Sequence, residues 1–172
     1  NLTLGAGSVY AAEVQGAVSD RVVVTGTAAL AGTLRLLPLG GTYVFATPYT
    51  LLTAAGGASG AFTRVETQGS FGDGVTTRVA DTGADVQLTL VPAPLAPIVT
   101  QQAATRPALS LAASGNAYAV ALGLDRAVAA GGDPSSLFAL YNLPASAIPA
   151  AVNRGDQSTC TNTWPSPRLR RC

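Results

Sequence analysis

The chain has 172 residues, which allow one modest hydrophobic core or an elongated array of repeats and exclude two large domains. Hydrophobic residues make up 48% of it and aromatic residues only 6%, while 19 glycines and 11 prolines are too many for a helical bundle. The net charge of +1 gives no nucleic-acid footprint, and the lack of histidine excludes Ser-His-Asp catalysis and the commonest metal ligand. We therefore expect a non-enzymatic chain of short strands and many turns, with no cofactor, no metal and no nucleic-acid partner.

The first 91 residues alternate between apolar and polar positions, as half-buried strands do; the runs 21–25 and 33–37 are examples. Glycine clusters, such as those at residues 40–41 and 72–74, predict the turns between them. Strands at this spacing suit either a sandwich or a solenoid. The small core residues and the recurring order of strand, glycine, small-residue bridge and second strand favour the solenoid. We therefore expect an all-β fold, a right-handed parallel β-helix, over residues 1–91.

Residues 92–115 are rich in proline and alanine and should form a linker. Pro92, Pro94 and Pro97 each lack a backbone N–H, so they cannot donate to a strand ladder and favour an extended segment. The absence of any run of about 20 apolar residues leaves the chain without a membrane-spanning helix of its own. Methionine is also absent, and we expect a processed or truncated piece of a longer protein.

Residues 116–152 should be a short helical segment. Val120, Leu124 and Val128 recur every four residues and would form one apolar stripe of a helix over residues 116–130. Asp133 followed by proline predicts the start of a second short helix, and a third should cover residues 145–152.

Composition changes abruptly at residues 153–172, which hold four of the ten arginines, the single tryptophan and both cysteines. We expect a disordered tail here, and a shifted reading frame would explain the change. Cys160 and Cys172 would form a disulfide in an oxidising compartment and remain free thiols otherwise, and the sequence leaves both states open.

Four runs of residues, in this order and at this spacing, resemble the C-terminal end of autotransporter passenger domains. They are Gly7-Ser8-Val9-Tyr10, the run from Ser19 to Leu34, the run from Thr47 to Ala54, and Gly60-Ala61-Phe62. Residues 116–125 and 137–152 are similar to the helical stretch between passenger and barrel in that family. The resemblance therefore covers about residues 1–152.

The resemblance implies a non-catalytic stalk or cap in type V secretion, with an autochaperone role in folding the passenger at the bacterial outer-membrane surface. The implied partners are the passenger's own repeats, a C-terminal outer-membrane barrel that is absent from this chain, and host surface molecules met by a virulence factor. The family continues after residue 152 into the barrel, whereas this chain continues into its atypical tail.

Six residues lie where the resemblance is densest, and we expect structural roles for them at turns, caps or buried rings. They are Asp20, Gly26, Gly32, Tyr49, Gly60 and Phe62. Glycine would serve tight corners that other residues cannot adopt, and the two rings would fill the core.

Two short motifs suggest other functions. Asp81-Thr82-Gly83 resembles the active-site loop of retroviral-type aspartic peptidases, in which a dimer brings two aspartates together to activate water. In that reading Ala121-Leu122-Gly123 would be the later apolar element of the peptidase. Arg154-Gly155-Asp156 is an integrin-type tripeptide and would make the chain an adhesin.

Overall fold

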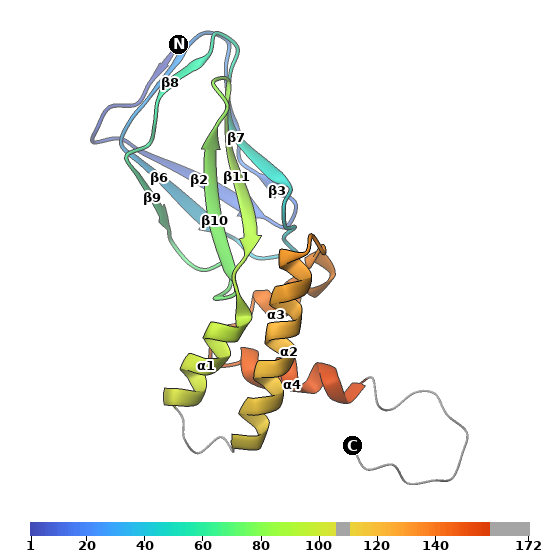
Figure 1. The fold of residues 1–172 in the computed structure, drawn as a ribbon. Coiled ribbons are helices and arrows are strands. Elements are labelled where there is room, and N and C mark those ends of the chain that lie inside the picture. The colour runs from blue at the N-terminus through green and yellow to red at the C-terminus, as the bar shows by residue number, and fades with distance from the viewer. Residues whose placement is uncertain (106–110, 159–172) are drawn as a thin grey trace.

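The structure is a computed structural model that describes residues 1–105 and 111–158. Three sheets and a group of helices make up this part of the chain (Figure 1). The helices lie together at one end of the sheets, and the N-terminus lies at the opposite end (Figure 1). None of the helices in the described ranges combines the length and apolar character that crossing a membrane requires.

The first sheet is entirely parallel and contains β1 (Leu2–Thr3), β5 (Ala28–Leu30) and β8 (Ala58–Gly60) in that order. The second runs in the order β3 (Val18–Ser19), β2 (Val9–Gln15), β6 (Thr33–Pro38) and β9 (Arg64–Thr67). The third runs in the order β10 (Val75–Asp81), β11 (Asp85–Pro92), β7 (Pro48–Ala54) and β4 (Val22–Val24).

Parallel pairing recurs between successive stretches of chain. Leu2 pairs with Ala28, which pairs in turn with Ala58. Thr33 pairs with Val9 on one side and with Arg64 on the other. Residues 1–26 thus lie along residues 27–56, and apolar side chains that alternate with polar ones meet in the space between the sheets.

The expected all-β, right-handed parallel β-helix is wrong for this chain. β2 and β3 are antiparallel, and β11 is antiparallel to both β7 and β10, so two of the three sheets are mixed. The cause lies in residues 75–92, where two alternating segments are joined by the short turn around Gly83 and can only fold back as an antiparallel hairpin.

In the described ranges, four α-helices and one short 3-10 helix follow the strands. They are α1 (Leu95–Thr105), α2 (Leu111–Ala129), η1 (Ser135–Leu137), α3 (Phe138–Tyr141) and α4 (Ile148–Ser158). The extended linker expected over residues 92–115 is therefore largely helical. Pro97 is compatible with α1 because it is the third residue of the helix, where a backbone N–H has no partner within the helix.

The other expected boundaries also shift. Residues 153–158, expected to be disordered, continue α4, whereas residues 159–172, including Cys160 and Cys172, lie outside the described residues. In α2 the expected stripe of Val120, Leu124 and Val128 is only partly buried. Among residues 115–129 of this helix, Ala117 and Ala121 are the buried ones, and their small side chains suit its close packing with α1 and α4.

The main hydrophobic core is continuous from the sheets into the helices. It joins strand residues such as Leu36, Leu51 and Leu90 with Phe138 and Ile148 of the helical part. A second, smaller cluster lies between β4, β5, β7 and β11 and includes Val24, Leu30, Leu52 and Val86. The described residues contain no buried polar or charged side chain.

Candidate functional site: layer corners and the junction between sheets and helices

Of the three glycines for which we expect structural roles, two have positive φ and lie where successive stretches of chain cross closely. Gly32 has φ of +80°, and a Cβ there would collide with the carbonyl oxygens of Ser8 and Gly5. Gly60 has φ of +78°, and its Cβ would collide with the carbonyl oxygen of Leu30. Both positions therefore need glycine for two independent reasons, the backbone conformation and the lack of space.

Gly26, the third of these glycines, does not have positive φ, and the nearest atom to its Cβ position belongs to a side chain. A Cβ at Gly26 would collide with the side chain of Asn1, whose Oδ1 accepts hydrogen bonds from the backbone N–H and the hydroxyl of Thr27 at 2.9 and 3.2 Å. The Gly26 carbonyl accepts the N–H of Gly56 at 2.9 Å. Gly26 thus allows the first residue of the chain to lie against the next corner.

Tyr49 is 4% exposed, and its hydroxyl joins two loops. The hydroxyl donates to the Gly16 carbonyl at 2.8 Å and accepts the Val44 N–H at 3.1 Å. Burial raises the pKa of Tyr49, which the hydrogen bond from the Val44 backbone partly opposes. The buried ring and the two hydrogen bonds make this side chain a link between β7 and the turn after β2.

Phe62 and Asp20 both lie next to Tyr10. The Phe62 ring is partly buried and stacks on the Tyr10 ring at a centroid distance of 6.2 Å. Asp20 is exposed, and its carboxylate accepts the Glu13 N–H at 3.3 Å while its own N–H donates to the Glu13 carbonyl at 2.9 Å. Phe62 is therefore a less complete core residue than Tyr49, and Asp20 closes the β2–β3 turn.

Tyr10 should make the protein less stable in alkali. Burial, helped by the negative charge of Asp20, raises its pKa from 10.0 to about 12, and its hydroxyl donates to the Leu51 carbonyl at 2.7 Å. In the unfolded chain tyrosine loses its proton near pH 10, so the unfolded state gains stability between pH 10 and 12 while folded Tyr10 stays neutral. We expect the free energy of unfolding to fall over this range.

The measurement is urea unfolding at several pH values in wild type and Tyr10→Phe. The slope between pH 10 and 12 should be shallower in the variant than in the wild type. Identical slopes in wild type and Tyr10→Phe would contradict the assignment. Tyr49 and Tyr141, whose pKa values burial also raises, contribute to the slope in both proteins.

The aspartic-peptidase loop forms the turn between β10 and β11. The Asp81 carboxylate accepts the Gly83 N–H at 2.7 Å, and the Thr82 N–H donates to the Asp85 carbonyl at 2.9 Å. The matching apolar element lies within α2, with Gly123 exposed on it, and does not follow a strand next to Asp81. In this arrangement the Asp81 carboxylate stabilises a hairpin turn.

The adhesin motif at residues 154–156 falls in α4 by its backbone, and its side chains lie outside the described residues. Within the described part of the chain no three acidic or cysteine side chains gather in a way that would hold a metal ion.

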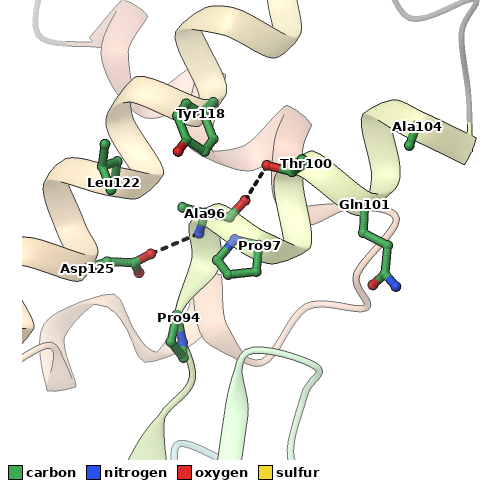
Figure 2. A pocket seen from close by; sticks show the side chains of 9 residues that line it. All are labelled: Pro94, Ala96, Pro97, Thr100, Gln101, Ala104, Tyr118, Leu122 and Asp125. Carbon is green, nitrogen blue, oxygen red and sulfur yellow. Dashed lines mark hydrogen bonds between the residues drawn. The ribbon is translucent and has the colours of Figure 1, made fainter.

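An open groove of about 700 Å³ lies between α1 and α2 (Figure 2). Its walls are mostly apolar, with Pro94, Pro97, Tyr118 and Leu122 among them. Asp125 is the one ionisable carboxylate in the groove wall, and its two oxygens accept the N–H groups of Leu95 and Ala96 at 2.7 and 2.9 Å.

Asp125 is a residue that sequence reasoning missed. It caps the first turn of α1 from α2, thirty positions away in the chain. Backbone N–H groups at a helix N-terminus have no partner within the helix, and a carboxylate also interacts favourably with the helix dipole there. A local search for caps does not find this contact, because the acceptor lies on a different element.

The turn at residues 72–74 docks the sheets onto the helical part. The Asp73 carboxylate accepts the Ala145 N–H at 2.6 Å, and the Asp73 N–H donates to the Leu143 carbonyl at 3.1 Å. The Gly74 N–H donates to the Tyr141 carbonyl at 3.0 Å. The sequence predicts this turn but not its partner, which lies about seventy residues further along.

Five aromatic rings pack together at the same junction. Three come from loops of the strand part (Tyr43, Phe45 and Phe71), and two come from α3 (Phe138 and Tyr141). The centroid distance is 4.7 Å between Phe45 and Phe138, and 5.1 Å between Tyr43 and Phe71. Such pairs stabilise beyond their buried area by about 0.5–1.5 kcal/mol each.

Comparison of the chain with protein-family models, with curated proteins and with solved structures found no match.

Proposed function

We propose that this chain is a non-catalytic cap and folding unit of a surface-displayed passenger of the autotransporter type. The observation that carries the proposal is a difference between the two sides of the stacked strands. We use "open layer" for β1, residues 9–12 of β2, and β4. This layer has free strand edges without charge, whereas the opposite side carries charged residues and a hairpin.

Each strand of the open layer has a strand partner on one side only. β1 and β4 are the outermost strands of their sheets, and β3 pairs only with Val14 and Gln15 of β2. The open layer contains no proline and no charged residue, although charge and proline are the usual protection of a strand edge. Edges of this kind accept further strands.

The opposite side is protected. β9 carries Arg64 and Glu66, which form an ion pair at 2.9 Å, and the outermost strand β10 carries Arg78 and Asp81. Val79 of β10 packs against both hydrophobic clusters, so the hairpin covers the end of the core. β8, the remaining outer strand on this side, carries no charge, but its first backbone N–H donates to the turn of the hairpin at 2.7 Å. Charged or covered edges discourage pairing, and further parallel strands would therefore add preferentially at the open layer.

This asymmetry suits the terminal unit of a longer array. Passenger repeats would pair with the open layer, and the continuous core would provide a stable body from which strand pairing extends, repeat by repeat. The proposed location is the bacterial outer-membrane surface, with the passenger repeats and a C-terminal outer-membrane barrel as partners.

A surface-display assay tests the proposal, with the chain placed between a reporter passenger of parallel strand repeats and an outer-membrane barrel. The displayed reporter should resist protease. Ala11→Lys together with Val23→Lys charges the open layer at two exposed positions, so circular dichroism of the isolated chain should stay unchanged. Protease resistance of the reporter should fall severalfold.

The matched control places two lysines on the opposite edge, by Thr76→Lys and Ala80→Lys at exposed positions of β10. This variant should protect the reporter as well as the wild type does. Equal protection with a lysine-bearing open layer, or with the chain deleted, would show that the open layer does not receive the passenger.

A further inference from the structure

The helices pack on one another through buried residues at the end of the main core. Leu95 and Val99 of α1 are buried together with Ala117 and Ala121 of α2, and Ile148 is buried where α4 packs on α2. Asp125 holds the start of α1 to α2 by two hydrogen bonds. We call α1, α2, α3 and α4 together the helical unit, because these helices contact one another.

The helical unit reaches the strand part mainly through loops and one connecting segment. We call the buried rings of Tyr43, Phe45 and Phe71 the aromatic floor, because α3 lies on them with Phe138 and Tyr141. All three rings of the floor are at most 3% exposed in the docked arrangement. Lifting α3 would open the aromatic floor to solvent or to another apolar partner.

Residues 72–74 supply the polar contacts of this docking. The Asp73 carboxylate binds the Ala145 N–H, although Asp73 itself is exposed, and Gly74 joins Tyr141 through its N–H and Ala93 through its carbonyl, the latter at 2.8 Å. Ala93 lies between Pro92 and Pro94, in the short connection from β11 to α1. The turn therefore contacts both the connection and the segment from the end of α3 toward α4.

We infer that the helical unit is a strap that closes over the aromatic floor, with residues 93–94 as the hinge and Asp73 as the latch. Closed, the strap completes the main core. Released, it swings on the hinge with its own helices intact and presents the aromatic floor while the three sheets stay folded. This device depends on the junction alone and stands whether or not the chain caps a passenger.

Residue 74 of the turn must be glycine in the closed state, because the docked helical unit leaves no room for a side chain there. A Cβ at Gly74 would lie 2.9 Å from the Cα and the carbonyl oxygen of Tyr141, closer than real Cβ contacts allow. Gly74 does not have positive φ, so alanine strains nothing within the turn itself. Gly74→Ala is therefore a wedge that acts on the docked strap and spares the backbone conformation of its own loop.

The experiment is residue-resolved amide hydrogen exchange by NMR on the full chain. In Gly74→Ala and in Asp73→Ala, the backbone N–H of residue 73, which donates to Leu143 in the closed state, should exchange about tenfold faster or more. Amides within α2 and within β7 and β11 should keep their wild-type rates. Binding of a dye that fluoresces on apolar surfaces should rise, because the aromatic floor opens.

Asp73→Asn should give an intermediate rate, because its amide oxygen still accepts the Ala145 N–H without the negative charge. Asp133→Ala is the matched control: its carboxylate accepts the N–H of Ser135 at 2.9 Å within one loop and bridges no two parts. It should leave residue 73 unchanged. The strap is refuted if residue 73 exchanges no faster in Gly74→Ala, or if α2, β7 and β11 accelerate equally with it.

Discussion

Phe138→Ala should lower the free energy of unfolding by about 3–5 kcal/mol. The Phe138 ring is 3% exposed and lies with its centroid 4.7 Å from that of Phe45 and 5.6 Å from that of Tyr43. Removing it leaves a cavity between the aromatic floor and α3, because neither the sheets nor the helix can collapse fully into the space. Urea unfolding followed by circular dichroism measures the loss.

Leu137→Ala is the control for this change, since Leu137 precedes Phe138 and is 40% exposed. It should change the free energy of unfolding by about 0.5 kcal/mol or less. A similar loss in both variants would mean that the damage comes from weakening the short η1–α3 segment. A loss confined to Phe138→Ala places the stabilising effect in the aromatic contacts, and it ties the helical unit to the core of the sheets.

Local pattern in the sequence locates strands but does not give their direction. The alternation in residues 33–37 predicts the strand that the structure has as β6, and the run 21–25 contains β4. Alternation says only that one face of each strand is buried, and it is the same in parallel and antiparallel pairs. The antiparallel pairing of β10 with β11 and of β11 with β7 therefore contradicts the predicted parallel fold.

Proline is also an ambiguous signal in the sequence, because it occurs both where a strand ends and where a helix begins. Pro92, Pro94 and Pro97 predict the end of the strands, and β11 does end at Pro92. They also predict an extended linker, which is wrong because Pro97 lies in the first turn of α1. Whether a proline ends one element or begins the next depends on the residues that follow and on the acceptor that caps the new helix, here Asp125.

The junction was not predictable from spacing. Asp73 and Asp125 cap backbone groups that lie 72 and 30 positions away, so each appears in the sequence as an ordinary charged residue. The aromatic floor comes from loop segments, where alternation gives no signal. By contrast, Gly32 and Gly60 were singled out because they lie where the family resemblance is densest, and the structure gives both of them positive φ at close crossings of the chain.

Gly32→Ala should lower the free energy of unfolding by about 3 kcal/mol or more. A residue with a Cβ at φ of +80° costs about 1–2 kcal/mol on its own. In addition the new methyl group would collide with the Ser8 and Gly5 carbonyl oxygens, so residues 1–26 must move away from residues 27–56. That movement would also weaken the hydrogen bonds that the Gly32 carbonyl accepts from Thr63, at 2.8 Å from its N–H and 2.9 Å from its hydroxyl.

Gly83→Ala separates the two causes, because Gly83 has φ of +85° but no atom within 4 Å of its Cβ position. It should cost only the conformational part, about 1–2 kcal/mol. The difference in free energy of unfolding between the two variants then measures the cost of the steric collision at Gly32, where residues 1–26 and 27–56 approach closely. Equal losses in free energy of unfolding would mean that residues 1–26 separate from residues 27–56 at Gly32 without cost. The open layer would then be too loosely held to receive further strands.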